Sequence, residues 1–275
     1  MRNDPAVSAL SQEEVEALNR HGVFFKKRVL HELSGVHGLG IVGEEVGVSY
    51  GGSRVIDILA VDRRAPPLVY FVFECKRAYV ENRRWIFFKD IDQHFRVART
   101  QGLLGNSSIF RERTLPNPPV CSEGYELNKS TTKADQDPIF RAAEQLATGF
   151  LGFIARRARE LGNSDRVERY VPILVTTAEL AVVQSDLSTV SIATGRLDSF
   201  PDARSWDWLI LKHPFPTPQH LDADFRDKHT PPAVLAEWHQ LHKESMYVVR
   251  APMLRRFLSL EQLDELRTAK TEPPK

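Results

Sequence analysis

Cysteine, long apolar runs and net charge are all scarce in this chain of 275 residues. Its two cysteines, Cys75 and Cys121, form neither a disulfide framework nor a CxxC zinc pattern, which favours a reducing compartment. No run approaches the ~18 apolar residues of a membrane span, and the N-terminus has no apolar signal core. We therefore expect a cytoplasmic protein that does not contact a membrane.

Several function classes also lack their sequence signatures. The nine histidines show no HxH or HxxxH spacing, which argues against a histidine-based metal site. A P-loop is missing, so any ATP-driven step would need a partner protein. With 37 basic against 36 acidic residues, a nucleic-acid surface would have to come from local segregation of charge.

The pattern of apolar residues predicts an α/β fold with a mixed central sheet flanked by helices. The run at 68–76 is apolar on both alternating faces, which predicts a central strand covered on both sides. Further strands are expected at 41–48, 55–61, 170–177, 189–193, 208–211 and 247–249. Helices are expected at 11–33, 85–100, 139–161, 232–241 and 252–266, with a polar loop at 117–137. These elements predict a core at 1–178, an insertion in it at 79–136, and a C-terminal α/β extension at 179–275 packed on the core.

Two acidic residues and a lysine lie on two neighbouring predicted strands. Asp57 lies on the strand at 55–61, whereas Glu74 and Lys76 end the strand at 68–76. Chance places about one Asp/Glu-x-Lys triplet in a chain of this composition, so the strand context carries the argument. Side chains two positions apart share a face of a strand. Two carboxylates there can hold Mg²⁺, and the lysine can orient an attacking water or offset charge on phosphorus.

Each acidic residue also has a purely structural interpretation. Asp57 can bond to a turn at a strand end, and Glu74 with Lys76 can form an exposed cross-strand ion pair. Glu44 and Glu45 can simply belong to a solvated edge strand. An aspartate flanked by two isoleucines is costly to bury without a partner, which favours a functional site.

With Asp57 on one strand and Glu74-Cys-Lys76 on the next, and with 16 residues between Asp57 and Glu74, the chain resembles the PD-(D/E)xK, or restriction-endonuclease-like, nuclease superfamily. The resemblance covers about residues 20–178 and includes the later helix and strand. It implies a Mg²⁺-dependent nuclease, with Mn²⁺ as a substitute ion. In such a nuclease Asp57, Glu74 and the Cys75 carbonyl bind the metal, and Lys76 assists catalysis.

Two positions depart from the pattern of this superfamily. Many members carry a glutamate on the first core helix, where this chain has Phe24-Phe-Lys-Lys-Arg28, so the number of metal ions stays open. The candidate additional acids are Glu32, Glu44 and Glu45. Some members place a glutamine on the helix after the lysine, and Gln145 is preferred here over Gln93 as a supporting residue.

A basic segment follows the Glu-Cys-Lys triplet. Residues 76–113 hold nine basic and four acidic residues, with aromatic residues among them. Such a segment can neutralise phosphates and stack bases, or it can be a solvated helix whose aromatic side chains pack inward. The candidate nucleic-acid-binding residues are Arg77, Arg83, Arg84, Lys89, Arg96 and Arg99.

The chain is therefore expected to be a metal-dependent endonuclease that cuts DNA, serving in antiviral defence against foreign DNA or in repair. No sequence-reading module or ATPase is evident, so targeting is expected from a homo-oligomer or from a partner protein. Two alternatives stay open. One is a catalytically inactive nuclease-fold module for nucleic-acid binding or complex assembly, and the other is an RNase with the same site.

Overall fold

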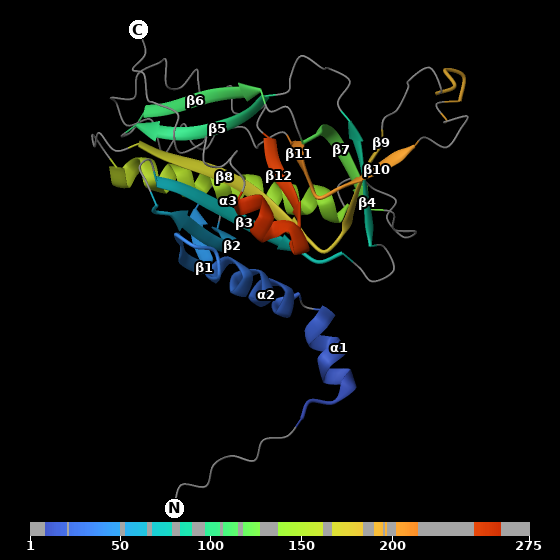
Figure 1. Ribbon diagram of the computed structural model, residues 1–275, viewed down its shortest axis with the longest axis horizontal. Helices are drawn as coiled ribbons and strands as arrows, with labels where there is room; N and C mark the ends of the chain where they lie inside the picture. Colours follow the sequence, from blue (N-terminus) through green and yellow to red (C-terminus); the bar gives the residue numbers. More distant parts are fainter. Residues whose placement is uncertain are drawn as a thin grey trace, which may run out of the picture.

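Twelve strands form one mixed sheet with helices on both faces in the described part of the chain, which confirms the α/β class (Figure 1). The computed structural model describes residues 9–20, 22–49, 53–64, 68–78, 83–89, 97–104, 107–114, 118–126, 137–161, 167–183, 190–194, 196, 202–213 and 245–259. The helices are α1 (Gln12–Arg20), α2 (Val23–Ser34), α3 (Pro138–Leu161), the 3-10 helix η4 (Ala251–Met253) and α6 (Leu254–Leu258). The strands are β1 (Leu39–Ser49), β2 (Ser53–Asp62), β3 (Leu68–Lys76), β4 (Arg84–Lys89), β5 (Val97–Leu104), β6 (Ser107–Thr114), β7 (Val120–Glu126), β8 (Val167–Thr176), β9 (Glu179–Val183), β10 (Ala203–Trp206), β11 (Trp208–Lys212) and β12 (Ser245–Arg250). Their order across the sheet is β1-β2-β3-β8-β12-β11-β7-β4-β9-β10, with β5 and β6 attached at β8.

Two helices form where a single helix was predicted at 11–33. α1 and α2 are separated at Gly22, whose φ of 70° lies in the left-handed region that glycine adopts without steric cost. The prediction was wrong because the apolar stripe alone does not reveal this break. α2 buries Val29 and Leu33 against the sheet. Lys26 lies three and seven positions before them and therefore falls on the same side of the helix.

An antiparallel meander of β1, β2 and β3 is followed by β8, which lies parallel to β3. Ile58 on β2 lies opposite Phe73 on β3, and Lys76 on β3 lies opposite Thr176 on β8. Parallel neighbours need a crossover connection, and α3 lies between them in the chain. The strands predicted at 41–48, 55–61, 68–76 and 170–177 are confirmed.

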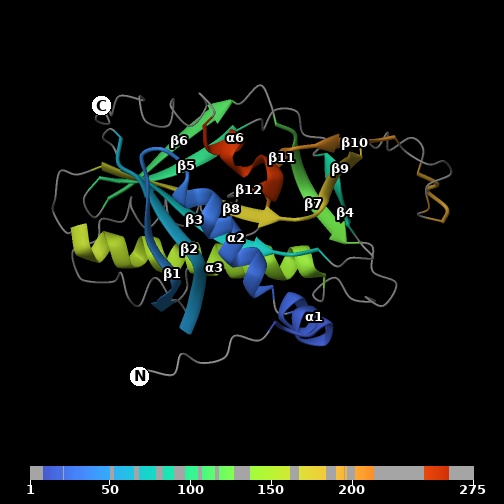
Figure 2. The ribbon, with the colours of Figure 1, turned by 60° about the horizontal axis from the view of Figure 1, so that its bottom comes forward.

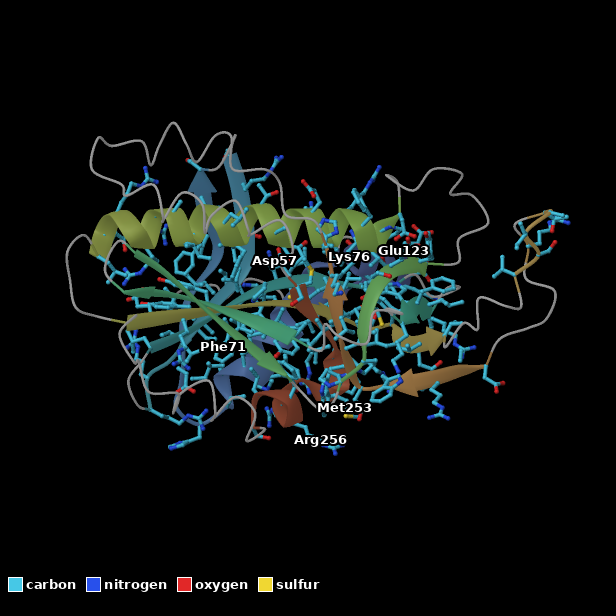
Figure 3. All side chains as sticks on the ribbon, turned by 90° about the horizontal axis from the view of Figure 1, so that it is seen from above. Asp57, Phe71, Lys76, Glu123, Met253 and Arg256 are labelled. Carbon is cyan, nitrogen blue, oxygen red and sulfur yellow. The ribbon has the colours of Figure 1, made fainter. Side chains whose placement is uncertain are left out.

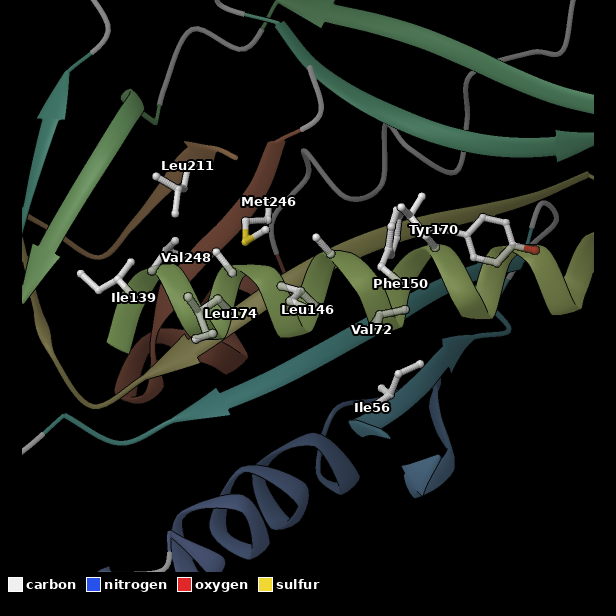
Figure 4. Close-up of a cluster of buried hydrophobic side chains, with 14 of the residues drawn as sticks. Ile56, Val72, Ile139, Leu146, Phe150, Tyr170, Leu174, Leu211, Met246 and Val248 are labelled. Atoms are coloured by element: carbon white, nitrogen blue, oxygen red, sulfur yellow. The ribbon is translucent and has the colours of Figure 1, made fainter. Parts of the chain in front are cut away.

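α3 confirms the helix predicted at 139–161 and covers one face of the sheet. Its first turn is capped by Asp137, whose carboxylate accepts the backbone N–H of Ile139 at 2.7 Å. Figure 4 shows Leu146 and Phe150 on this helix packed with Leu174 of β8 in the larger apolar core. Burying this side of α3 removes much apolar surface from water, which is the main favourable contribution to folding.

Apolar side chains fill both faces of the central strands. α2 lies on one face of these strands and α3 on the other (Figure 2). Tyr70 and Val72 of β3 belong to the core under α3, whereas Phe71 and Phe73 belong to the core under α2 and α6. This alternation with a period of two is the geometry of a strand buried on both sides. The predicted central position of the strand at 68–76 is therefore confirmed.

Strands replace the described parts of the helix predicted at 85–100 and of the loop predicted at 117–137, while 90–96, 117 and 127–136 lie outside the described residues. In β4, Trp85 and Phe87 are fully buried while Ile86 between them is partly exposed, so the aromatic residues follow the period of a strand. The helix prediction was wrong because it took these aromatic residues for one face of a helix. β7 falls within 117–137 and pairs with β4 and β11, so the loop prediction was also wrong.

The C-terminal strands join the same sheet. β11 and β12 confirm the strands predicted at 208–211 and 247–249, and β12 lies parallel to β8. The strand predicted at 189–193 was wrong, because Val190 forms an isolated bridge and a turn follows, in which the Ser191 N–H donates to the Arg196 carbonyl at 2.8 Å. Of the helix predicted at 252–266, η4 and α6 extend to Leu258, while 260–266 and the helix predicted at 232–241 lie outside the described residues. Among the helices described, none combines the length and the apolar character needed to cross a membrane.

Candidate functional site

Glu45, Asp57 and Glu74 occupy matching positions on three neighbouring strands, and we call them the carboxylate row. On β1, Glu44 and Val46 lie opposite Ile58 and Ile56 of β2, which places Glu45 opposite Asp57. On β3, Phe73 lies opposite Ile58, so one step further along Glu74 takes the position beside Asp57. The strands that carry Asp57 and Glu74 are thus hydrogen-bonded neighbours, as the sequence predicted.

Where β2 and β3 stop pairing, the Asp57 carboxylate accepts a backbone N–H of β3 in place of a backbone carbonyl of β2. The paired positions of the two strands end at Ile58 and Phe73. Beyond them the Cys75 backbone N–H donates to Asp57 Oδ2 at 2.8 Å. A buried N–H needs an acceptor, so this bond stabilises the strand end and fixes the direction of the carboxylate. The second carboxylate oxygen is left for other contacts.

Glu74 is a buried carboxylate with no hydrogen bond or ion pair to any residue in the described part of the chain. Only 9% of the residue is exposed. Burial and the nearby negative charge of Asp57 raise the pKa of Glu74 to about 8, although Lys76 and Lys26 act in the opposite direction. The alternative of an exposed Glu74–Lys76 ion pair is therefore wrong. Added positive charge beside Glu74 would lower this pKa and favour the ionised form.

Asp57 is in a similar electrostatic environment. Burial, with repulsion from Glu45, raises the pKa of Asp57 above its ordinary value, while the Cys75 N–H, Lys26 and Lys76 counteract the rise. Figure 3 labels Asp57 and Lys76 near each other and away from Met253 and Arg256. The lysine of the triplet therefore acts on both carboxylates of the predicted site.

The Cys75 side chain turns away from this chemistry. It is partly buried and packs with the apolar core under α2 and α6. Burial raises the pKa of the Cys75 thiol well above its ordinary value, so the thiolate that would bind a metal or attack a substrate is disfavoured. Any contribution of Cys75 to a metal site would come from its backbone carbonyl.

Lys26 is a member of the site that the sequence interpretation missed. Its ammonium group forms an ion pair with Glu45, and its charge acts on Asp57 and Glu74. Burial alone lowers the pKa of Lys26, but the hydrogen bond to Glu45 and the charge of Asp57 outweigh it, and the pKa is raised. The available signal was the position of Lys26 on the same helical stripe as Val29 and Leu33, where an apolar residue is expected.

The three candidate additional acids differ in their ion-pair partners. Glu44 forms an ion pair with Lys27 at 2.6 Å, and Glu32 pairs with Arg28 and with Arg255. Glu45 alone of the three lies in the row beside Asp57 and raises its pKa. Glu45 is therefore the additional acid that the geometry favours.

The other predicted residues lie outside the carboxylate row. Gln145 is exposed on α3, and none of its contacts among the described residues is a hydrogen bond to the row. Gln93 and Arg96 lie outside the described residues, as does the side chain of Arg99. Arg83 and Arg84 are exposed near the start of β4, whereas Arg77 and Lys89 are partly buried.

The aromatic residues of the basic segment are divided by burial. Trp85 and Phe87 are fully enclosed by the core under α3, so their rings cannot stack on nucleic-acid bases. Phe88 is partly exposed and meets Tyr125 of β7 edge to face. The basic side chains at the start of β4 are the accessible part of the predicted nucleic-acid surface.

The carboxylate oxygens of the row suit a cation that binds few protein atoms. Over the ranges that the structure describes, no three His, Cys, Asp or Glu side chains form a ready-made metal cage. Mg²⁺ usually keeps several waters and is held by one or two carboxylates. Glu74 provides a buried carboxylate and Asp57 a partly buried one on adjacent strands, and Glu45 provides a third that forms an ion pair with Lys26. The residues therefore fit Mg²⁺ or Mn²⁺ more closely than a zinc cage.

A scan against protein-family models found no match to this chain, and searches of curated proteins and of solved structures found none either. The carboxylate row and its surroundings are therefore the basis for inferring a function.

Proposed function

We propose that this protein is a metal-dependent nuclease with a restriction-endonuclease-like core, and that it hydrolyses phosphodiester bonds in DNA. The observation that carries the proposal is the position of the partly buried Asp57 beside the buried Glu74 on adjacent strands, with the charge of Lys76 acting on both. A structural role does not account for Glu74, which is buried without a hydrogen bond among the described residues. Buried carboxylates with raised pKa values and a specific charged partner are typical of functional sites.

The order and pairing of the elements support the proposed core. α2, the β1–β3 meander, α3 and β8 follow one another as a helix, three strands, a helix and a strand, with β4 to β7 between β3 and α3. β3 and β8 are parallel neighbours at the centre of the sheet. In the superfamily that the sequence resembles, the acidic residues and the lysine lie on the two strands that correspond to β2 and β3.

Each residue has a defined part in this proposal. Asp57 and Glu74, with the Cys75 carbonyl, would hold the divalent ion, which polarises a phosphoryl oxygen and acidifies a bound water. The Asp57 carboxylate is already oriented by the Cys75 N–H. The Lys76 ammonium would orient the attacking water and offset the negative charge that builds on phosphorus. Glu45 would hold Lys26 beside this pair.

The biological setting is part of the same proposal. A cytoplasmic nuclease without its own ATPase motif would receive its targeting from a second copy or from a partner protein, and it would serve in antiviral defence or in repair. Cutting both strands of a duplex needs two active sites or the repositioning of one. The exposed Arg83 and Arg84 are the described basic residues that we assign to DNA binding.

The deciding experiment is a cleavage assay on plasmid, linear and single-stranded DNA and on RNA, with Mg²⁺ or Mn²⁺ and with EDTA. We expect cleavage of DNA that EDTA abolishes, and a loss on the order of 100-fold or more in Lys76→Ala. Lys27→Ala is the matched control, because Lys27 is paired with Glu44 outside the carboxylate row. Cleavage that persists in both Lys76→Ala and Glu74→Ala would show that the site assignment is wrong.

The same assay separates the alternatives. Purified protein that binds DNA but never cuts it, alone or with the products of neighbouring genes, would favour a binding or assembly module. Cleavage of RNA in preference to DNA, lost in the same variants, would keep the site and change the substrate.

A further inference from the structure

Lys26 places a second positive charge at the carboxylate row, in addition to that of Lys76. Its side chain is only 13% exposed and comes from the inward stripe of α2. The ammonium group pairs with Glu45 and acts on Asp57 and Glu74. A lysine at this depth is costly unless opposite charges compensate it. The compensating charges here are the same carboxylates that form the candidate metal site.

Glu45, the partner of Lys26, has an unusual backbone conformation. Its φ of 50° makes it the only non-glycine residue with a positive φ in the described part of the chain. It lies between Glu44 and Val46, which pair with the residues on either side of Asp57. Non-glycine residues in this region are uncommon and often occur at functional sites. The Glu45 side chain is 67% exposed, and its ion pair with Lys26 connects β1 to α2.

The charges of the site determine how many divalent ions it can hold next to a substrate. The row provides three carboxylates, and Lys26 and Lys76 provide two ammonium groups. With one divalent ion and one phosphodiester the assembly is neutral, whereas a second divalent ion would leave two uncompensated positive charges. Since charges this close together interact strongly in a partly buried site, the neutral assembly is favoured.

Glu74 gives an independent indication that a cation belongs here. It is nine-tenths buried, it lies in the row, and within the described residues it has no hydrogen bond or ion pair. Lys26 is already committed to Glu45, so its ammonium group does not satisfy the Glu74 carboxylate. One position for an added cation, between Asp57 and Glu74, is therefore left beside the built-in cation at Glu45.

We propose that Lys26, held by Glu45, is a built-in second cation of this site, so that the protein binds a single divalent ion. The positive charges that face the phosphodiester are then that ion, Lys26 and Lys76. This inference rests on the proposed nuclease function. It makes Lys26 a positioning residue that determines the stoichiometry of the metal. It also predicts that removing Lys26 releases Glu45 as a ligand for a second ion.

The test is a titration of the full-length protein with MnCl₂ at neutral pH, in which free Mn²⁺ is followed by electron paramagnetic resonance. Ions bound elsewhere are subtracted with Asp57→Asn. We expect one Asp57-dependent ion in the wild type and two in Lys26→Gln, with the first ion bound about threefold to tenfold more tightly because a like charge has been removed. Lys26→Arg, which keeps the charge, and Lys27→Gln, the neighbouring lysine on α2, should both keep one ion.

The outcomes distinguish this inference from the proposed function. Two Asp57-dependent ions in the wild type would overturn the role of Lys26 while leaving a metal-dependent nuclease intact. The role of Lys26 is also overturned if Lys26→Gln changes neither the number nor the affinity of bound ions, provided that its circular dichroism matches the wild type. No Asp57-dependent ion in the wild type would overturn both proposals. The number of ions bound by the wild type needs no variant of Lys26. Two Asp57-dependent ions in the wild type would therefore overturn the role of Lys26 even if Lys26→Gln fails to fold.

Discussion

Asp57 on β2 accepts the backbone N–H of Cys75 on β3 at 2.8 Å, at the step where the two strands stop pairing. The carboxylate therefore has two separable properties, an acceptor oxygen that supports the strand end and a negative charge available to a metal. Asp57→Asn keeps an acceptor oxygen and removes the charge. Asp57→Ala removes both.

We expect Asp57→Asn to keep the free energy of unfolding close to that of the wild type while Mg²⁺-dependent cleavage falls on the order of 100-fold. Asp57→Ala should lose activity to the same degree and also about 1 to 2 kcal/mol of stability, because the Cys75 N–H loses its acceptor. Urea denaturation and a cleavage assay on the same preparations measure the two effects. Equal losses of stability in both variants would contradict the role of the hydrogen bond.

The buried Glu74 predicts that stability depends on pH when divalent ions are absent. Folding raises the pKa of Glu74 from its ordinary value of 4.5 to about 8, chiefly by burial and then by the charge of Asp57. Between these values the folded state holds a proton that the unfolded chain has released. In EDTA the contribution of Glu74 to the free energy of unfolding should therefore be greatest below about pH 4.5 and fall as the pH rises toward 8, by on the order of a few kcal/mol.

Glu74→Gln tests this pH dependence because a glutamine resembles the protonated acid. It should remove much of the decline measured by urea denaturation between pH 5 and 8, whereas Glu179→Gln, on the exposed end of β9, should leave the decline unchanged. Added Mn²⁺ should restore stability at the alkaline end in the wild type and have little effect in Glu74→Gln. An unchanged decline in Glu74→Gln would mean that other groups cause it.

Local patterns were sufficient to predict the part of the fold that carries the site. The run at 68–76 is apolar on both faces, and β3 is buried on both faces. The helix at 139–161 has a continuous apolar stripe, and α3 follows it. Asp57 and Glu74 could be placed on adjacent strands because the short connection between them favours an antiparallel pair. These features depend on residues that are close in sequence.

The remaining parts depend on contacts that are distant in sequence. Trp85 and Phe87 belong to a strand because β4 pairs with β7 and β9. The residues near position 85 contain no sequence signal for these distant partners. Lys26 was missed for the same reason, since its partner Glu45 lies on a different element. A lysine within an amphipathic helix is usually solvated, and only the packing of α2 on the sheet brings its ammonium group to the carboxylate row.

The core under α3 predicts unequal effects for two phenylalanines of the same helix. Phe150 is fully buried, whereas Phe140 is 43% exposed and meets the ring of His213. Phe150→Ala should reduce the free energy of unfolding by about 3 to 5 kcal/mol, because it leaves a cavity between α3 and the sheet. Phe140→Ala should cost about 1 kcal/mol or less. Comparable losses for the two in chemical denaturation would be inconsistent with the packing of α3.

The partly buried Arg157 on α3 forms an ion pair with the buried Glu168 on β8, on the sheet face that α3 covers. Glu168 is almost fully buried, and it also accepts the Tyr170 hydroxyl at 2.6 Å. The hydrogen bond from Arg157 to Glu168 raises the pKa of Arg157. Burial, together with the hydrogen bond from its own hydroxyl to Glu168, raises the pKa of Tyr170. Arg157→Met would leave the Glu168 carboxylate in the interior without its cation, and we expect a loss of about 3 to 5 kcal/mol in the free energy of unfolding.

The double variant Arg157→Met/Glu168→Gln distinguishes two contributions to the free energy of unfolding. One is the stabilisation by the ion pair, and the other is the destabilisation by an unpaired charge. If the cost arises from the orphaned carboxylate, the double variant should recover a substantial part of the stability lost in Arg157→Met. Both proteins should retain metal binding at the carboxylate row, because neither residue is among the charged groups that act on Asp57 and Glu74. A double variant as unstable as the sum of the two single variants would instead mean that the pair contributes no coupling energy. The packing of Arg157 over the Tyr70 ring would then account for the loss in Arg157→Met.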